Sequence, residues 1–216
     1  MNILVTGGAG YIGAHTVIQL LQNNYNVAVL DNLSNSNESS IYMIEKISGQ
    51  KINFFKGDIR DSNFLESVFS SQKFDAVLHF AGLKSINEAM NEPLSYYDNN
   101  VLGSVQLLKV MQKYNTKKII FSSSATVYGD SNDSPLREDM PTGIPTNPYG
   151  RSKLIIEDIL ADLHNSDPQW CIARLRYFNP VGAHKSGLIG ENPQGHPNNL
   201  LPFISQTAVG IHEKMF

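Results

Sequence analysis

Three side chains that could exchange a proton with a substrate lie in two short segments of the sequence. Tyr149 and Lys153 stand four residues apart in PYGRSK, and Ser124 ends the run KKIIFSSS. If Pro148 begins a helix, Tyr149 and Lys153 face the same side of it, because residues four apart are neighbours on a helix surface. A free tyrosine has a pKa of about 10, and a nearby ammonium favours the phenolate and lowers that pKa. We therefore predict that Tyr149 exchanges protons with a substrate hydroxyl and that Ser124 donates to the same oxygen.

The Tyr149 and Lys153 pair is not specific by itself. The pattern Tyr-x-x-x-Lys also arises by chance, and it then describes a surface tyrosine beside a solvated lysine. Ser122 and Ser123 have a similar alternative as ordinary polar residues at the end of a strand. The chemical interpretation therefore depends on whether a cofactor site lies in the same fold.

A glycine-rich turn near the N-terminus predicts such a site. TGGAGYIG, residues 6–13, follows an apolar strand and opens an amphipathic helix. Gly8, Gly10 and Gly13 fit G-x-G-x-x-G, in which the glycines allow a tight turn, the approach of a pyrophosphate and close packing of helix and strand. Free N–H groups at the helix N-terminus would then face the phosphates. The context of strand, turn and helix indicates a dinucleotide site.

Two aspartates follow later predicted strands. Asp31 ends the second strand, where an acid is suited to bind the adenosine ribose hydroxyls and to repel a 2′-phosphate. No Arg or Lys occurs in DNLSNS, residues 31–36, so we predict NAD and not NADP. A turn aspartate that caps local backbone is the alternative for Asp31. Asp58 follows the third strand and could accept a hydrogen bond from the adenine amino group.

The elements that must position these residues alternate along the chain. Apolar runs of strand length occupy 2–6, 26–31, 52–57, 75–82, 117–124 and 170–178, and helical patterns occupy 11–24, 39–48, 62–71, 95–114 and 149–165. Alternation of this kind predicts an α/β fold, a Rossmann-like doubly wound parallel sheet with helices on both faces. Residues 130–148 and 179–197 read as loops.

Composition narrows the class of protein. The chain has 216 residues and a formal net charge of −3, without a long Lys/Arg run, so we expect no nucleic-acid or anionic-membrane surface. No apolar run reaches the roughly 18 residues of a membrane span, and MNILVTGG has no leader pattern, so a cytoplasmic protein is expected. The single cysteine, Cys171, is predicted to be a small buried core residue. The histidines show no metal-ligand spacing, and we predict no metal.

Several further motifs carry a family resemblance. The combination of Ser124, Tyr149 and Lys153 behind TGGAGYIG resembles the short-chain dehydrogenase/reductase superfamily in its extended form. DNLSNS, GDIRD, HFAGLK, YYDNN, SSSATVYGD, PTNPYGRSK, RYFNPVGAH and NPQGHPNNLLPF are similar to motifs of UDP-glucose 4-epimerases, in order from residue 1 to about 210. RYFNPVGAH and PNNLLPF are far more specific than the glycine turn.

The resemblance implies an activity: reversible interconversion of UDP-galactose and UDP-glucose in galactose metabolism, by transient oxidation at sugar C4 with tightly bound NAD. It implies that Tyr149 takes the proton of the 4-hydroxyl, that Ser124 orients the 4-oxygen, and that Lys153 tunes Tyr149 and binds the nicotinamide ribose. The family's dimers pair long helices like those at 95–114 and 149–165, so a homodimer is expected.

The resemblance also implies which residues contact each ligand. The implied NAD contacts are Gly7, Gly10, Tyr11, Ile12, Gly13, Asp31, Asn32, Asn35, Ser36, Asp58, Ile59, Phe80, Ala81, Lys84, Asn99, Ser122, Tyr149, Lys153, Tyr177 and Phe178. The implied UDP-sugar contacts are Ser124, Tyr149, Asn179, Asn199 and Leu200. Residues 1–178 would form the NAD-binding domain, and 179–216 would begin the UDP-sugar-binding part. Chains of the family continue well beyond residue 216, so a truncated chain that turns over poorly is expected.

Two other functions stay open on the sequence. One is a related NAD-dependent nucleotide-sugar dehydratase or decarboxylase, although dehydratases typically place acidic residues after the active-site Ser or Thr, and here Ala125, Thr126 and Val127 follow Ser124. The other is a non-catalytic NAD-binding regulator, because a fold alone does not decide function.

Overall fold

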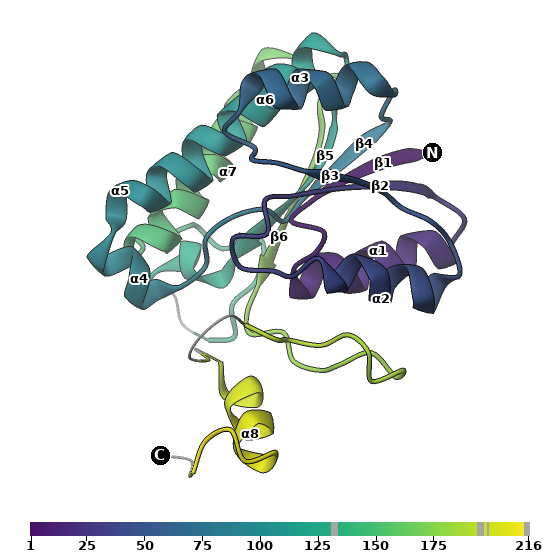
Figure 1. Ribbon diagram of the computed structural model, residues 1–216. Helices are drawn as coiled ribbons and strands as arrows, with labels where there is room; N and C mark the ends of the chain where they lie inside the picture. The colour runs from purple at the N-terminus through teal and green to yellow at the C-terminus, as the bar shows by residue number, and fades with distance from the viewer. Residues whose placement is uncertain (131–133, 194–196, 198, 214–216) are drawn as a thin grey trace.

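Six parallel strands form the centre of the computed structural model, which describes residues 1–130, 134–193, 197 and 199–213 (Figure 1). The strands are β1 (Asn2–Thr6), β2 (Asn26–Asp31), β3 (Asn53–Lys56), β4 (Ala76–His79), β5 (Lys118–Ser124) and β6 (Cys171–Tyr177). Their order in the sheet is β3-β2-β1-β4-β5-β6, and every neighbouring pair is parallel. The predicted doubly wound α/β fold is confirmed.

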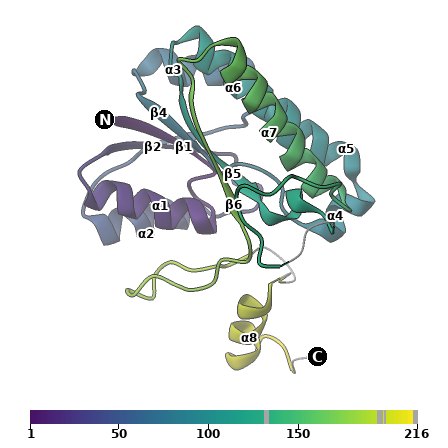
Figure 2. The same ribbon diagram turned by 180° about the vertical axis from the view of Figure 1, so that it is seen from behind.

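Helices cover both faces of this sheet (Figures 1 and 2). The helices are α1 (Tyr11–Gln22), α2 (Ser39–Ser48), α3 (Ser62–Ser71), α4 (Ile86–Asn91), α5 (Pro93–Tyr96), α6 (Gly103–Lys113), α7 (Pro148–Ser166) and α8 (Leu200–Ala208), with a π-helical turn η1 (Tyr97–Leu102) and a 3₁₀ turn η2 (Ala125–Tyr128). Helices α1 and α2 lie on one face, and α3, α6 and α7 lie on the other.

The central strands are apolar on both faces, and this explains why helices cover the sheet on both sides. Leu4 on β1 packs with Leu107 of α6 on one face, whereas its neighbour Val5 packs with Val17 and Ile18 of α1 on the other. Successive side chains of a strand point to opposite faces, so a strand covered on both faces must be apolar throughout. This is why β1 reads as the continuous run NILVT.

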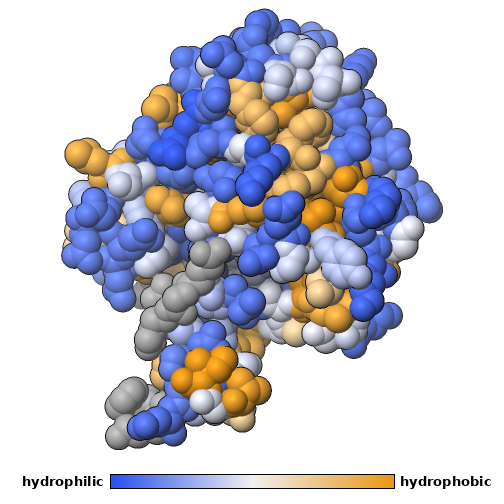
Figure 3. All heavy atoms as spheres, viewed as in Figure 1, coloured by the Kyte–Doolittle hydropathy of each residue, from blue (hydrophilic) through white to orange (hydrophobic). Residues whose placement is uncertain are grey.

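Helix α8 stands apart from the sheet. Leu200 and Leu201 at its start are exposed, and Figure 3 shows apolar side chains gathered on its surface. No helix in the described part of the chain is long and apolar enough to span a membrane.

The predicted helix over 95–114 is interrupted. It consists of α5, the π turn η1 and α6, and α4 was not predicted. Asn100 in η1 is buried, and its side chain accepts from the backbone N–H of Leu83 (2.8 Å) and donates to its carbonyl (3.0 Å). A π turn contains one residue more than an α turn and often marks a functional site. Periodicity alone does not reveal such an insertion.

The prediction of a buried Cys171 was wrong. Cys171 is exposed because it lies on β6, the outermost strand, where Leu175 is also 40% exposed. The neighbouring Trp170 is buried, so the apolar run WCIARL mixes a core residue with edge-strand residues. The sequence pattern did not distinguish an edge strand from a central one.

The core on the α6 face makes a first testable prediction. Leu107 is fully buried, so Leu107→Ala leaves a cavity and should lower the free energy of unfolding by about 2–5 kcal/mol. Tyr42→Ala is the control: Tyr42 is 61% exposed on α2, and its truncation should change stability by less than about 0.5 kcal/mol. Urea unfolding measures both, and equal losses would contradict this description of the core.

Candidate active site

A cavity of about 780 Å³ opens along the carboxyl ends of the parallel strands. Its walls come from the turn after β1, the loop after β2, the segment after β4, the end of β5, the start of α7 and the segment after β6. Strands β1 and β4 are neighbours whose following segments leave in different directions, and ligands of open α/β sheets bind at such a point.

Backbone packing at the glycine turn fits a bound dinucleotide. Gly7 has φ +69°, and a Cβ built there would lie 2.5 Å from the backbone nitrogen of Ala81. A Cβ on Gly13 would lie 2.2 Å from the carbonyl oxygen of Gly7. Gly10 is the N-cap of α1 and, lacking a side chain, leaves the helix start uncovered toward the cavity. This is the geometry that lets a pyrophosphate approach the backbone at a helix N-terminus.

Asp31 is buried at the floor of this turn. One carboxylate oxygen accepts from the N–H of Ala9 (3.0 Å), and the other accepts from the N–H of Leu33 (2.9 Å) and the hydroxyl of Ser36 (2.9 Å). The carboxylate therefore caps local backbone, the alternative that the sequence allowed, while the residue also lines the cavity. These bonds fix the position of the carboxylate at the edge of the cavity.

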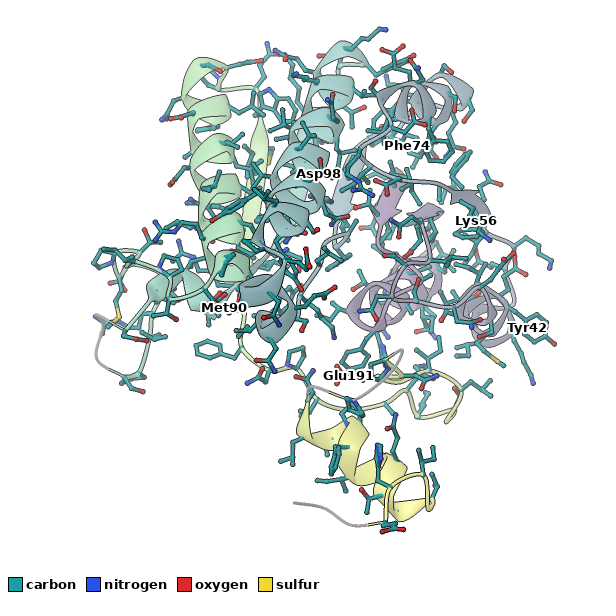
Figure 4. All side chains as sticks on the ribbon, turned by 60° about the vertical axis from the view of Figure 1, so that its left-hand side comes forward. Tyr42, Lys56, Phe74, Met90, Asp98 and Glu191 are labelled. Atoms are coloured by element: carbon teal, nitrogen blue, oxygen red, sulfur yellow. The ribbon has the colours of Figure 1, made fainter. Side chains whose placement is uncertain are left out.

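Asp58 does not line the cavity, although its neighbours Gly57 and Ile59 do. The Asp58 carboxylate accepts from the Arg60 guanidinium (2.8 and 3.0 Å) and from the side-chain amide of Asn32 (3.0 Å). The hydrogen bonds from Arg60 are the main reason why the pKa of Asp58 lies well below its usual range. Arg60 also bonds Asp98, which Figure 4 shows on the neighbouring helical segment. Asp58 is thus committed to an ion-pair cluster beside the cavity.

The three predicted catalytic residues meet at the far end of the cavity. Helix α7 begins at Pro148 and is capped by Asn147, whose side chain accepts from the N–H of Gly150 (2.8 Å). Tyr149 and Lys153 both face the cavity from this first part of α7, and Ser124 reaches it from the end of β5. The hydroxyl of Ser124 lies beside the Tyr149 phenol, close enough for hydrogen bonding to affect the pKa of the phenol.

Lys153 is held below Tyr149. Its Nζ donates to the carbonyl of Ser122 (2.8 Å) and lies 5.9 Å from the ring centroid of Tyr149 and 4.9 Å from that of Phe121. The side chain is buried, and burial lowers the pKa of Lys153 to about 8.

The predicted lowering of the Tyr149 pKa is wrong for the protein alone. Burial of the phenol raises the pKa of Tyr149 above its ordinary value, and the hydrogen bond with Ser124 lowers it by less. The Lys153 ammonium bonds the Ser122 carbonyl and not the phenol, so desolvation has the larger effect. The sequence placed the two groups on one helix face correctly but did not reveal how deeply both are buried.

The segment after β6 closes another wall of the cavity. The hydroxyl of Tyr11 donates to the carbonyl of Gly182 (2.7 Å), which joins the glycine turn to this segment. Glu191 accepts from Lys84 (3.1 Å) and from the side-chain amide of Asn199 (2.5 Å). Figure 4 places Glu191 between α8 and the sheet domain. Glu191 was not predicted from the sequence, because an acid in an aperiodic loop gives no periodicity or motif signal.

The predicted site residues converge, with two exceptions. All predicted cofactor and substrate residues line this cavity except Asp58 and Leu200, and Leu200 is 67% exposed on α8. Residues that line it but were not predicted include Gly82, Leu83 and Thr126. Thr126 donates its hydroxyl to Ser124 (2.9 Å) and its N–H to the same oxygen (3.2 Å). Within the described residues, no group of three or more His, Cys, Asp or Glu could hold a metal ion.

Comparison with known proteins identifies the family. The model of the "NAD dependent epimerase/dehydratase family" matches residues 3–216. The chain belongs to this family. It is 57% identical over 215 residues to a UDP-glucose 4-epimerase of Yersinia enterocolitica and 53% identical over 215 residues to that of Bacillus subtilis (strain 168), covering 100% of this chain in both and 64% and 63% of those proteins.

Solved structures of this family agree with the fold. The crystal structure of UDP-glucose 4-epimerase from Bifidobacterium longum in complex with NAD⁺ and UDP has a TM-score of 0.97 at 51% identity, covering 99% of this chain and 64% of that one. The enzyme from Stenotrophomonas maltophila, with bound NAD and formylated UDP-arabinopyranose, has a TM-score of 0.95 at 47% identity, covering 99% of this chain and 63% of that one. The chain thus spans just under two thirds of the length of the relatives that it matches.

The buried Lys153 makes stability depend on pH. Lysine in an unfolded chain has a pKa of about 10.4, whereas that of Lys153 in the folded chain is lowered to about 8. Between these values the unfolded chain binds more protons, so stability increases as pH rises. We expect the free energy of unfolding of the wild type, relative to Lys153→Met, to increase between about pH 7 and 10 in urea titrations. Lys113→Met is the control. Glu66 raises the pKa of Lys113, so the difference in free energy of unfolding between the wild type and Lys113→Met should not increase with pH over this range.

Proposed function

We propose that the whole protein interconverts UDP-galactose and UDP-glucose with bound NAD, as a UDP-glucose 4-epimerase of galactose metabolism. The observation that carries the proposal is the meeting of Ser124, Tyr149 and Lys153 at one end of a cavity whose other end has a dinucleotide-type glycine turn. The identity of the relatives supports the substrate pair.

The cavity has groups suited to each part of NAD. Gly10 and the start of α1 would hold the pyrophosphate, Asp31 the adenosine ribose, and Lys153 the nicotinamide ribose. Lys84 lines the same space and adds positive charge near the phosphates. Bound NAD supplies a reversible hydride acceptor for C4 of the sugar.

Tyr149 would exchange the proton of the sugar 4-hydroxyl. The phenol is half-buried, lines the cavity and lies beside Ser124, so the substrate oxygen can be shared by the two hydroxyl groups. Lys153 contributes positive charge below the ring and favours the phenolate while the proton is away. Asn179 and Asn199 line the sugar side of the cavity and offer amide groups to the substrate.

The rival activities have less support. A dehydratase needs an acid near the active-site serine to eliminate water, and the turn η2 after Ser124 carries Ala125, Thr126 and Val127. A non-catalytic regulator does not need a serine beside a half-buried tyrosine above a buried lysine.

Three further proposals concern the whole protein. Residues 1–178 form the NAD-binding domain and 179–216 begin the UDP-sugar-binding part. The protein is cytoplasmic, consistent with the absence of a membrane-spanning helix from the described residues. It forms a homodimer through the helical segment 95–114 and α7; exposed apolar side chains such as Leu94 and Leu102 on and next to that segment support this arrangement.

Tyr149→Phe tests the role of the phenol. Loss of the hydroxyl should lower kcat for UDP-galactose conversion by at least about 100-fold, because no group then exchanges the 4-hydroxyl proton. NAD affinity should change by only a few-fold, as measured by calorimetry. Tyr42→Phe is the control, since Tyr42 is 61% exposed on α2. Retention of full activity in Tyr149→Phe would falsify the assignment.

The variant Asp31→Asn tests why the protein should prefer NAD to NADP. The wild type should bind NAD at least roughly tenfold more tightly than NADP, because a buried carboxylate repels a 2′-phosphate. Asp31→Asn keeps an oxygen for the N–H of Ala9 but removes the charge, so the ratio of NAD affinity to NADP affinity should decrease. Calorimetric titration of each variant with both nucleotides measures this ratio, and an unchanged ratio would exclude a role for the Asp31 charge.

A further inference from the structure

A fourth ionisable residue continues the line of catalytic side chains on α7. Glu157 follows Lys153 by one helical turn and Tyr149 by two, so the three side chains lie along one face of the helix. Glu157 is only 1% exposed. A buried carboxylate is costly unless other groups satisfy it, so its partners indicate why it is there.

The partners of Glu157 come from two neighbouring strands. The hydroxyl of Ser123 on β5 donates to one carboxylate oxygen (2.5 Å). The Arg176 guanidinium on β6 donates Nε to the same oxygen (3.0 Å) and Nη2 to the other (2.7 Å). Arg174 adds a longer contact (3.7 Å). Ser123 and Arg176 are opposite each other in the β5–β6 register, so one carboxylate ties α7 to both strands at one level of the sheet.

The cluster also borders the turn that follows Ser124. The Arg176 guanidinium lies 4.7 Å from the ring centroid of Tyr128, the last residue of η2. Helix α7 packs against β5, β6 and η2 together, and Figure 2 shows it beside β5 and β6. Glu157 on α7 therefore lies where β5, β6 and η2 pack against this helix, next to the end of the cavity that contains Ser124, Tyr149 and Lys153.

The partners of the catalytic residues sit on the same short stretch of β5. Lys153 bonds the carbonyl of Ser122, Glu157 bonds the side chain of Ser123, and Tyr149 lies beside the hydroxyl of Ser124. Three residues of α7, each one turn apart, thus meet three successive residues of the strand. Tyr149 and Lys153 line the cavity and Glu157 does not, and the Glu157 contact is the one that also includes β6.

We propose that Glu157, held by Ser123 and Arg176, is a positioning residue that sets α7 against β5 so that the Tyr149 phenol meets Ser124. The proposal rests on the proposed function, since it names what aligns the proton-exchanging pair. Misplacement of a reacting group by about 1 Å can cost roughly 100-fold in rate, so this alignment affects catalysis more than substrate binding.

The experiment compares variants that weaken the contact of Glu157 with Ser123 and Arg176 with a control variant on the same helix. Glu157→Gln, Ser123→Ala and the double variant each weaken the contact, while Leu160→Ala removes a buried apolar side chain one turn further along α7 and leaves the carboxylate partners untouched. In the whole protein, Glu157→Gln should lower kcat for UDP-galactose by at least roughly tenfold, with KM changed by less than about threefold. Leu160→Ala should destabilise the fold but keep kcat within about twofold wherever the protein is folded.

The double variant of Ser123 and Glu157 shows whether the two residues affect kcat through one shared contact or independently. If Ser123 and Glu157 act through one contact, the losses in kcat should not add, and the double variant should resemble Glu157→Gln. If Glu157→Gln does not fold, Ser123→Ala and Arg176→Lys take its place, and each should lower kcat while changing KM little. Unchanged kcat in the folded variants, or an equal loss in Leu160→Ala, would overturn the proposal.

A second measurement does not depend on the reaction. Phenol ionisation followed by ultraviolet absorbance, with Tyr149→Phe subtracted in each background, reports the environment of Tyr149. Its titration should shift in Glu157→Gln and stay in place in Leu160→Ala, and a titration unaffected by Glu157→Gln would contradict the positioning role. Should the wild type leave both UDP-sugars unchanged, the proposed function fails, and this titration still decides whether Glu157 positions Tyr149.

Discussion

The parallel pairing of β1 with both β2 and β4 is the constraint on which the rest of the molecule depends. After β1 the chain passes through α1 on one face of the sheet, and after β4 it passes to the α4–α6 segment near the other. Two neighbouring strands whose continuations diverge leave space between them at their carboxyl ends. The cavity occupies that space, and its glycines allow the backbone of the β1 turn to lie against the segment after β4.

A second constraint is the polar inner face of α7. Lys153 and Glu157 are buried where a helix of this size usually presents apolar residues, which appear only from Ile156 and Leu160 onward. The strands accommodate these charges with a carbonyl, a hydroxyl and a guanidinium. Burial of the Glu157 carboxylate is tolerated because both of its oxygens accept hydrogen bonds. Lys153 donates one hydrogen bond to a carbonyl, and burial lowers its pKa.

The sequence predicted most of the fold and most of the candidate site, for a physical reason. Strand and helix patterns, the glycine turn and the Tyr149–Lys153 spacing are local features, and local features determine which side chains share a face. The sequence could not show the depth of burial, so it misjudged the Tyr149 pKa and the exposure of Cys171. Nor could it show partners distant in the chain, such as Glu191 with Lys84 or Asp58 with its neighbours on other elements.

The π turn at 97–102 determines how the helical segment fits on the sheet. Each residue of an α-helix rotates the chain by about 100°, so one additional residue turns the following helix face by that angle. Asn100 in this turn bonds Leu83, and Leu107, Leu108 and Met111 of α6 are buried after it. The turn therefore offsets α5, before it, from the direction that an uninterrupted helix would give it relative to α6, and a one-residue deletion within 97–102 would rotate the two helices against each other by about 100°.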